Sequence, residues 1–340
     1  MSQRKSRLIP EVDFSRDGKQ TGFIRAFHST HASAYGFIPI PIVVVKNGEG
    51  PTALFSAGNH GDEYEGQIAL TNLVKWLTPE KIKGRVIILP MANFPAAMAG
   101  RRVSPIDDVN MNRIFPGDPD GSITHQIAHY IDSELVPLAD LVIDLHSGGS
   151  SLMYVPCALA KQSSDPALYQ KQLAALRAFG APFTYIQGGA QQGQGADQTL
   201  GSGADRRGKI SLGTELGGSG TLTPAGLAIA ERGLRNLLVH MGILGQAEWA
   251  EPPAPTRFLD VRGAHTYVYA PESGLFEPLV ELGEEVVPGR PAARIHFPET
   301  PWLPPVEIAF QASGIVMCKR VPARTMRGDC LFHLGHDLAV

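Results

Sequence analysis

The stretch FSAGNHGDEYEG, Phe55 to Gly66, places one His, one Asp and two Glu directly after a short apolar run. Apolar residues then recur at helical spacing through residues 64–77. The pattern predicts a strand, a polar turn and a helix. Ligands of open α/β sheets bind beyond the carboxyl ends of the strands, so this turn is the first candidate for a functional site.

Two later apolar runs end in polar side chains in the same way. DLVIDLHSGG, residues 140–149, leads into His146, and ISLGTELGG, residues 210–218, leads into Glu215. Apolar residues recur at helical spacing over residues 124–139, 165–182 and 223–244, in the segments between and after these runs. Strands that alternate with helices predict an α/β fold, in which helices cover both faces of a mostly parallel or mixed sheet.

Composition restricts the class of protein. The chain has 340 residues, which suits one large domain and a small one, and its formal net charge is −3. That charge gives no support for a surface that binds nucleic acid or a membrane. The basic N-terminus lacks the apolar segment of a secretory signal, and no apolar run is long enough to cross a bilayer. Cys157, Cys318 and Cys330 form no CxxC pair and are predicted to be free thiols of a cytoplasmic protein.

The character of the sequence changes after Leu244. Residues 246–256 are rich in proline and lack periodicity, which predicts a linker. It separates an α/β domain, residues 1–245, from residues 257–340, where short strand and turn patterns predict a small all-β domain.

The predicted β domain contains a pseudo-repeat. Ser273-Gly274 corresponds to Ser313-Gly314, and Gly289 corresponds to Gly328. Two interlocked β-hairpin units give such a pattern, and it resembles the barrel-sandwich modules that carry lipoyl or biotinyl groups. Lys319 stands in a poor context for their carrier lysine, so a structural or site-lining role is expected. Both a cap over the site and a homo-oligomer contact remain open roles for this domain.

Two imidazoles and a carboxylate fit a catalytic zinc site, which uses three protein ligands and keeps a fourth position for water. His60 and Glu63 lie three residues apart, spanning the strand end and the first helical turn, and His146 would come from a neighbouring strand. Glu215 would then be free to act as a base. Asp144 lies two residues before His146 and points to the same face of its strand, where it is a candidate partner that fixes the histidine tautomer.

A simpler interpretation exists for part of the polar turn. Asp62 and Glu65 have the spacing of a capping box, which predicts that they start the helix. An HxxE pair by itself is weak support for a metal site. The order and the shared position at strand ends are what favour a site.

Four motifs together resemble the succinylglutamate desuccinylase/aspartoacylase family, which is related to the zinc carboxypeptidases: GNHGDEYEG at 58–66, NMNRIFPG at 110–117, DLHSGG at 144–149 and GTELGG at 213–218. The resemblance covers residues 35–245, and the C-terminal β domain is also similar to that of the family. It implies a zinc-carboxypeptidase-like mixed sheet. It also implies one Zn²⁺ per chain, bound by His60, Glu63 and His146, with Glu215 as the general base.

The same resemblance assigns the substrate contacts. Asn112 and Arg113 match the family's Asn-Arg pair, which binds a substrate carboxylate, and a guanidinium suits this through two parallel hydrogen bonds. Arg102 is favoured over Arg101 to polarise the scissile carbonyl. A further arginine before the catalytic glutamate corresponds to Arg206, with its neighbour Arg207 as the alternative.

The implied activity is hydrolysis of the amide bond of a small N-acyl amino acid. N-acetyl-2,4-diaminobutyrate is the leading candidate, and related N-acetyl or N-succinyl amino acids follow. A diaminobutyrate product asks for an acidic partner in the pocket, for which Asp107, Asp108 and Asp118 are the nearest candidates in sequence. The alternatives are a zinc carboxypeptidase acting on peptides and a non-catalytic binding protein on the same scaffold.

Two other regions are candidates to line the site. Residues 187–208 form a long loop rich in Gly, Gln and Ser, of the kind that often serves as a lid or binding loop. Tyr267 and Tyr269 of the predicted β domain could reach into the site, and the sequence favours neither.

Overall fold

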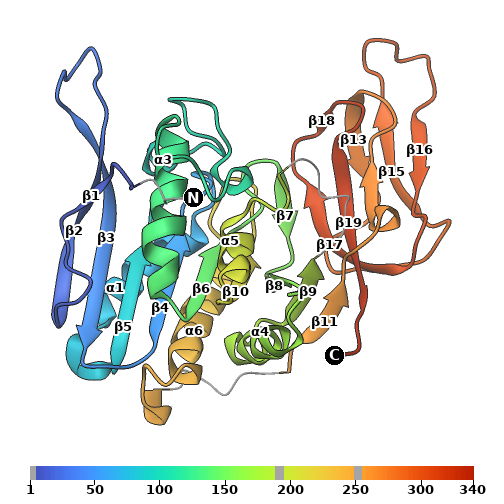
Figure 1. The fold of residues 1–340 in the computed structure, drawn as a ribbon. Helices are drawn as coiled ribbons and strands as arrows, with labels where there is room; N and C mark the ends of the chain where they lie inside the picture. The colour runs from blue at the N-terminus through green and yellow to red at the C-terminus, as the bar shows by residue number, and fades with distance from the viewer. Residues whose placement is uncertain (1–4, 188–194, 249–254) are drawn as a thin grey trace.

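The computed structural model describes residues 5–187, 195–248 and 255–340. A large mixed sheet runs across the molecule, and a second, four-stranded sheet packs beside its C-terminal end (Figure 1). In spatial order the large sheet consists of β1 (Ile9–Pro10), β2 (Gly18–Phe27), β3 (Phe37–Asn47), β5 (Gly84–Leu89), β4 (Thr52–Ala57), β6 (Leu141–Leu145), β10 (Ile210–Glu215), β8 (Cys157–Lys161), β9 (Phe183–Gln187), β11 (Arg257–Asp260), β19 (Cys330–Asp337), β17 (Gly314–Arg320) and β14 (Glu285–Val286), with β12 (Tyr267–Tyr269) beside β19 and β7 (Leu152–Tyr154) beside β17. The smaller sheet has the order β16 (Val306–Ala309), β15 (Pro291–His296), β13 (Gly274–Pro278) and β18 (Arg324–Thr325).

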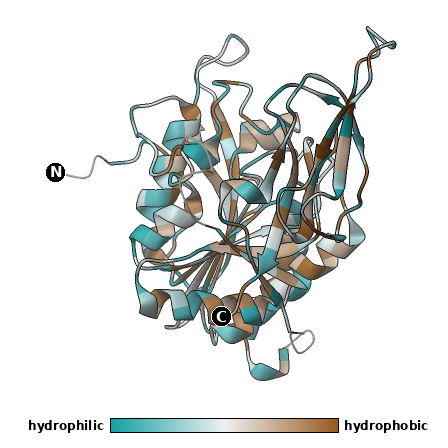
Figure 2. Cartoon of the chain, turned by 90° about the vertical axis from the view of Figure 1, so that its right-hand side faces the viewer, coloured by the Kyte–Doolittle hydropathy of each residue, from teal (hydrophilic) through white to brown (hydrophobic). Residues whose placement is uncertain are grey.

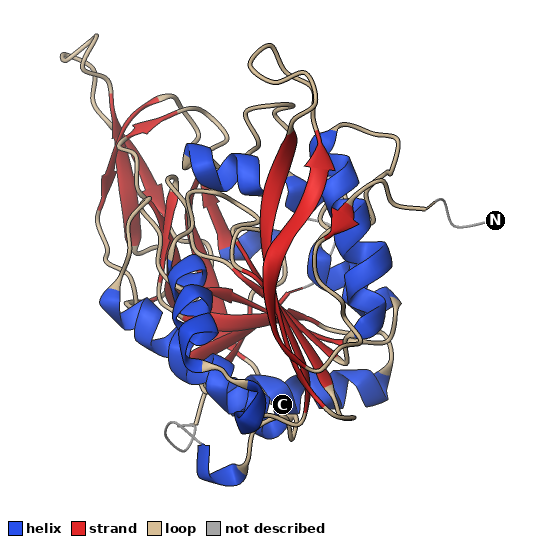
Figure 3. Cartoon of the chain, turned by 90° about the vertical axis from the view of Figure 1, so that its left-hand side faces the viewer, coloured by secondary structure: helices blue, strands red, loops and turns tan. Residues whose placement is uncertain are grey.

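Helices cover both faces of the large sheet, with strands enclosed between them (Figure 3). The α-helices are α1 (Glu65–Trp76), α2 (Phe94–Ala99), α3 (Ile123–Tyr130), α4 (Pro166–Phe179), α5 (Leu200–Arg206) and α6 (Pro224–His240). The short helical turns are η1 (Pro79–Lys81), η2 (Met111–Arg113), η3 (Ile131–Leu135), η4 (Val136–Leu138), η5 (Gln246–Glu248) and η6 (Ala264–Thr266). Helices α1, α4 and α6 pack on one face, and α3 and α5 pack on the other. The predicted α/β class, with a separate small β sheet near the C-terminus, is confirmed.

The strand sequences explain why both faces are covered. In β3, Val43 and Val45 enter the core shared with α1, α4 and α6, whereas Val44 enters the core on the opposite side. Successive side chains of a strand point to opposite faces, so an unbroken apolar run needs packing partners on both. Figure 2 shows this as hydrophobic strands in the interior and hydrophilic residues on the outer sides of the helices.

The centre of the sheet is parallel and brings distant motifs to one edge. Strand β4 pairs in parallel with β6, with Ser56 opposite Asp144, and β6 pairs in parallel with β10, with Asp144 opposite Gly213. Parallel strands in register end at the same edge of the sheet. The residues that follow β4, β6 and the end of β10 therefore meet there, as the sequence predicts.

The C-terminal pseudo-repeat is a pair of interlocked hairpins. Strand β13 of the first unit pairs with β18 of the second, and β17 of the second unit pairs with β14 of the first. Gly289 and Gly328 hold equivalent turns with φ of +83° and +91°, which favour glycine over other residues. The interlocking predicted from the sequence repeat is present.

This unit is continuous with the large sheet. Strand β11 pairs in parallel with β9, and β19 pairs antiparallel with β11. The boundaries 1–245, 246–256 and 257–340 remain a prediction, and residues 249–254 of the proposed linker lie outside the described residues.

Smaller expectations have mixed outcomes. The helix predicted over 124–139 is α only to Tyr130 and continues as the wider turn η3 and the tighter turn η4, because Pro137 has no N–H for the α-helical pattern. The cysteines are free thiols, as predicted. No helix among the described residues is both long and apolar enough to span a bilayer.

Packing of α6 on α4 depends on a glycine. A Cβ at Gly233 would lie 2.3 Å from Cε2 of the fully buried Phe179 ring. We expect Gly233→Ala to lower the free energy of unfolding by about 1–3 kcal/mol through overpacking, despite the better helix propensity of alanine. The measurement is urea unfolding followed by circular dichroism. Gly201→Ala in α5 is the matched control, because its Cβ would meet Thr199 Oγ1 at an ordinary 3.9 Å; equal losses in both variants would contradict the packing argument.

Candidate active site

The turn between β4 and α1 is shaped by close backbone packing. A Cβ at Gly61 would lie 1.9 Å from the carbonyl oxygen of Ala96, so only glycine fits. The Gly61 N–H donates to the carbonyl oxygen of Arg101 at 2.8 Å. This contact fixes the polar turn against the segment that carries Arg102.

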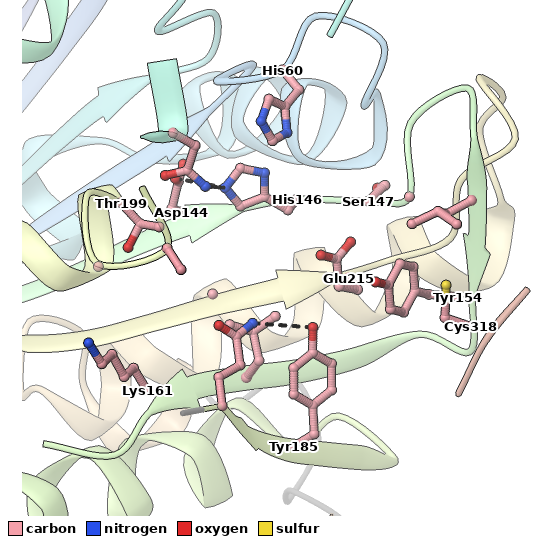
Figure 4. A pocket seen from close by; sticks show the side chains of 18 of the residues that line it. His60, Asp144, His146, Ser147, Tyr154, Lys161, Tyr185, Thr199, Glu215 and Cys318 are labelled. Carbon is pink, nitrogen blue, oxygen red and sulfur yellow. Dashed lines mark hydrogen bonds and ion pairs between the residues drawn. The ribbon is translucent and has the colours of Figure 1, made fainter. Parts of the chain in front are cut away.

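The turn places His60 and Glu63 against His146 at the end of β6. Glu63 Oε1 lies 2.7 Å from His60 Nδ1, and Glu63 Oε2 lies 2.8 Å from His146 Nδ1. The two imidazole centroids are 4.9 Å apart, and both rings face the same space in Figure 4. Glu63 lies before α1, so His60 and Glu63 both belong to the turn. The expectation that Glu63 lies in the first helical turn is wrong.

Oxygen acceptors fix the outer nitrogen of each ring. His60 Nε2 lies 3.1 Å from Asn110 Oδ1, and His146 Nε2 lies 2.8 Å from Asp144 Oδ2. Amide and carboxylate oxygens only accept hydrogen bonds, so each Nε2 carries a proton. In a neutral ring the lone pair is then on Nδ1, the nitrogen that faces Glu63. The predicted contact of Asp144 with His146 is present, and Asn59 Nδ2 holds the same Asp144 oxygen at 2.9 Å.

These three residues form the group that can hold a cation. His60, Glu63 and His146 are 3%, 4% and 9% exposed, and their ligand atoms all lie within 4.8 Å of one another. Two Nδ1 lone pairs and one carboxylate are a donor set that zinc accepts. The carboxylates of Glu63 and Asp144 add negative charge that a divalent cation would neutralise, so the residues present fit a metal ion.

The pKa directions follow from the same contacts. Burial alone would raise the pKa of Glu63, but His60 and His146 hold it far below its usual range. Burial lowers the pKa of His60 despite the nearby Glu63 carboxylate. Burial also acts to lower the pKa of His146, but Asp144 and Glu63 outweigh it and raise that pKa well above its usual value. The directions for Glu63 and His146 reflect the attraction between buried opposite charges, whereas burial outweighs that attraction at His60.

Glu215 extends from the end of β10 toward the space that the two histidines face (Figure 4). Its Oε2 is buried and has no hydrogen-bond partner among the described residues. Burial and the Glu63 carboxylate raise the pKa of Glu215 well above its usual range, while His146, Arg102 and Arg113 oppose this shift. A carboxylate with a raised pKa and a free oxygen is suited to exchange a proton with a bound molecule.

Two of the predicted arginines line the same cavity. Arg102 Nη1 lies 3.4 Å from His60 Nδ1 and 3.7 Å from Glu63 Oε1. Arg113 also lines the cavity, and its Nη1 donates to the Asn112 carbonyl at 2.7 Å. Arg101 instead approaches Asp108 at 3.3 Å with both side chains exposed. Of the two alternatives, the structure brings Arg102 to the site.

Asn112 lines the cavity, with its side-chain oxygen held in place. Its Oδ1 accepts from the Leu200 N–H at 3.2 Å, and its Nδ2 lies 3.1 Å from His146 Nε2. Because that Nε2 already carries a proton toward Asp144, Asn112 Nδ2 does not donate to it, and the amide N–H groups are available to a bound molecule.

Arg206 is not brought to this site. It is absent from the cavity lining, and its Nη1 donates to the Asp197 carbonyl at 2.8 Å. The alternative, Arg207, forms an ion pair with Asp132. We therefore correct the sequence-based assignment and leave both residues out of the site, because their side chains are committed to other contacts.

The capping box predicted for α1 is also wrong. Tyr64 occupies the N-cap position and no side chain caps this helix. Asp62 Oδ2 accepts from the Ser150 N–H at 2.7 Å, and Glu65 accepts from Ser147 Oγ at 2.6 Å and from the Thr223 N–H at 3.0 Å. Both carboxylates therefore tie the loops after β4, β6 and β10 to one another.

The cavity of about 460 Å³ extends from the histidines to the C-terminal unit. Tyr267 and Tyr269, which the sequence left as open candidates, line it. Tyr154, Tyr185 and His333 also line it and were not predicted. Nothing in the local sequence of these three residues marks them, because only strand pairing brings them together. Of the loop predicted over residues 187–208, residues 188–194 lie outside the described residues, and residues 200–206 form helix α5 where a loop was expected.

Comparisons with known proteins agree with this geometry. Residues 49–241 match the model of the succinylglutamate desuccinylase/aspartoacylase catalytic domain. The chain is 44% identical, over 97% of its length and 95% of the relative, to the N-alpha-acetyl-L-2,4-diaminobutyric acid deacetylase of Halomonas elongata.

Two solved structures resemble the chain along nearly its whole length. The succinylglutamate desuccinylase/aspartoacylase of Rhodobacter sphaeroides is 44% identical with a TM-score of 0.92, covering 98% of this chain and 100% of that one. The product-bound ectoine utilization protein EutE (DoeB) of Ruegeria pomeroyi is 39% identical with a TM-score of 0.93, covering 98% and 99%.

Glu65 bridges these loops through a buried carboxylate. Glu65→Ala would leave the buried Ser147 Oγ and the partly buried N–H of Thr223 without their acceptor, so we expect the free energy of unfolding to fall by about 3 kcal/mol. Chemical unfolding measures this. Glu49→Ala, at an exposed position, is the control; a loss no larger than in that control would show that Glu65 does not hold the loops.

Proposed function

Because this chain belongs to the succinylglutamate desuccinylase/aspartoacylase family, we propose that it hydrolyses the amide bond of an N-acyl amino acid at a zinc ion. The observation that carries the proposal is the buried group of His60, Glu63 and His146, with Glu215 and Arg102 facing the same cavity. Three cation ligands, a base with a free oxygen and a guanidinium in one cavity are the parts that amide hydrolysis requires.

The proposed ligands are His60 Nδ1, His146 Nδ1 and the carboxylate of Glu63. Their burial and the protonated Nε2 atoms suit zinc, since a neutral ring that carries its proton on Nε2 offers the Nδ1 lone pair to a cation beside Glu63. A zinc ion held there would supply Lewis-acid chemistry, lowering the pKa of water and polarising a carbonyl oxygen. Asn110 and Asp144 would keep the imidazoles in the ligating tautomer.

Glu215 is proposed as the general base and then the general acid. Its carboxylate takes a proton from the attacking water and passes it to the departing amine nitrogen. The unpartnered Oε2 gives this group an oxygen that is not committed to another contact. Arg102 donates to the carbonyl oxygen as negative charge develops on it.

Arg113 is proposed to bind the substrate carboxylate, together with the amide N–H groups of Asn112. Burial lowers the pKa of the Arg113 guanidinium, and Glu215 and Glu63 oppose that effect. A carboxylate fixed by a guanidinium holds the scissile amide near the base, which reduces the entropy cost of attack.

N-acetyl-2,4-diaminobutyrate is the substrate we propose within this class. Two findings support it. The relative from Halomonas elongata, named as the deacetylase of that compound, is 44% identical over 97% of this chain. The ectoine utilization protein has the same fold over 98% of this chain.

Removal of a ligand or of its hydrogen-bond partner tests the metal site. We expect His146→Ala to abolish zinc binding, and Asp144→Asn to weaken it by about ten- to hundredfold because the Nε2 proton loses its charged acceptor. Metal analysis after dialysis and competition with a chelator measure both effects. His240→Ala, at the end of α6, is the control. Full zinc occupancy in His146→Ala would contradict the proposed ligands.

Replacement of the base tests the chemistry itself. We expect Glu215→Gln to keep its zinc and to lose about 10²- to 10⁴-fold in kcat, the range for general acid–base catalysis. The assay compares N-acetyl-2,4-diaminobutyrate, N-acetylaspartate and N-succinylglutamate with dipeptides that carry a free C-terminus. Wild-type-like turnover in the variant would remove Glu215 from this role, and turnover of the dipeptides alone would identify a carboxypeptidase.

A further inference from the structure

In the described part of the chain, the substrate cavity offers a cationic amine no carboxylate that is both accessible and uncommitted. Among the described residues, the carboxylates that line it are Glu63, Asp144 and Glu215. Both oxygens of Glu63 and Oδ2 of Asp144 contact histidines, and Glu215 is the proposed base. Asp144 Oδ1 has no partner among the described residues, but it is buried and not exposed to a ligand. A diamino acid that keeps one free ammonium group therefore has to be recognised there by uncharged acceptors.

The aspartates that sequence proximity suggested do not change this. Asp107 accepts from Ser122 Oγ at 2.6 Å and from Thr124 Oγ1 at 2.8 Å, and Asp108 approaches Arg101. Asp118 accepts from the Asp120 N–H at 2.9 Å. None of the three aspartates lines the cavity.

A row of side chains across four strands forms the opposite wall. Tyr154 on β7 is paired with Cys318 on β17, Cys318 with His333 on β19, and His333 with Tyr267 on β12. Residues opposite each other on paired strands share a face of the sheet, and all four line the cavity. We call these four residues the cross-strand row.

His333 is the acceptor in this row. It is 5% exposed, and Tyr267 stacks on its ring with centroids 4.0 Å apart and planes inclined by 11°. Its Nε2 lies 3.3 Å from the Val261 carbonyl oxygen, which only accepts, so Nε2 carries the proton. Nδ1 then keeps a lone pair. Burial lowers the pKa of His333 to about 4, so the ring is neutral at physiological pH.

Two members of the row, Tyr154 and Cys318, lie across Glu215 from His60, and His333 and Tyr267 continue the row by strand pairing. Figure 4 shows Tyr154, Cys318 and Tyr185 on the far side of Glu215 from His60. Glu215 interacts electrostatically with Arg102 and Arg113 as well as with Tyr154 and Tyr185. A bound amino acid that presents its amide to Glu215 can therefore direct its carboxylate toward the arginines and its other end toward the row.

We propose that the cross-strand row is the specificity site for the free ammonium group of an N-acyl diamino acid, with His333 Nδ1 as its hydrogen-bond acceptor. The tyrosine rings add an uncharged surface of π electrons, which attracts a cation. This inference rests on the proposed function. It adds that the C-terminal β unit selects the substrate by its amine.

Two variants of one residue separate recognition from structure. His333→Gln keeps a donor at the position of Nε2, so the bond to Val261 can form, but it has no acceptor at the position of Nδ1. His333→Asn places an amide oxygen near the position of Nδ1 and loses the Val261 bond. His296→Gln is the matched control, because His296 lies in the same β unit, outside the cavity lining, and contacts Glu277 at 2.7 Å.

The substrates form a matched pair. Nα-acetyl-2,4-diaminobutyrate carries the ammonium group, and Nα-acetyl-2-aminobutyrate lacks it. We expect wild type and His296→Gln to favour the first in kcat/KM by about tenfold or more, the effect of one hydrogen bond to a charged group. In His333→Gln the preference should be lost, through a rise in KM for the diamino substrate alone, and His333→Asn should retain most of it.

Each other outcome is decisive. The inference is overturned, and the proposed function left intact, if the wild type hydrolyses both substrates equally. The same holds if His333→Gln keeps the wild-type preference. Equal losses in the Asn and Gln variants would show a merely structural role and also overturn it. Wild type with activity on neither substrate would reject the proposed function, and this inference with it.

A measurement on the wild type keeps the inference testable if the variants do not fold. In protein labelled with ¹⁵N-histidine, 2,4-diaminobutyrate should shift the Nδ1 resonance of a neutral imidazole toward its hydrogen-bonded position. 2-Aminobutyrate should leave that resonance in place. No difference between the two compounds would overturn the inference.

Discussion

The carboxylate of Glu63 is the contact on which the geometry of the site depends. Its two oxygens meet the Nδ1 atoms of His60 and His146 at 2.7 and 2.8 Å, and Oε2 also accepts from the Ser147 N–H at 3.1 Å. A buried carboxylate is costly unless several groups stabilise its charge. Glu63 therefore joins the turn after β4 to the end of β6, and a cation held between the same atoms would neutralise the charge that remains.

The surrounding fold keeps those atoms in place through a second layer of buried polar contacts. Asn110 and Asp144 fix the outer nitrogens of the two rings, while Asp62 and Glu65 tie the three loops together. These contacts sit at the edge where parallel strands end, so they are carried by rigid elements and short turns. A proton-transfer group such as Glu215 benefits from that rigidity, since its oxygen must stay aligned with a bound amide.

The sequence predicted the proposed metal ligands and the proposed base. It missed most of the residues that hold them in place. His60, Glu63, His146 and Glu215 stand in motifs whose spacing and order are visible in one chain. Asn110 belongs to the same NMNR motif, but nothing in the residue type shows that it would hold His60. Asp62 and Glu65 matched a capping box by spacing, yet the helix starts without one, because buried donors on distant loops compete for the same carboxylates. Arg206 matched a family position by its order in the chain, but its side chain donates to the Asp197 carbonyl oxygen and does not line the cavity.

By itself, the sequence determined the alternation of strands and helices, the strand-end motifs and the repeat in the C-terminal unit, because apolar periodicity and turn glycines act over a few neighbouring residues. The tertiary structure alone decided which arginine faces the cavity and which side chains form its far wall. Tyr154, His333 and Tyr267 are far apart in the chain and become neighbours only through the pairing of β7, β17, β19 and β12. Strand register is set by packing of the whole sheet, and no local pattern encodes it.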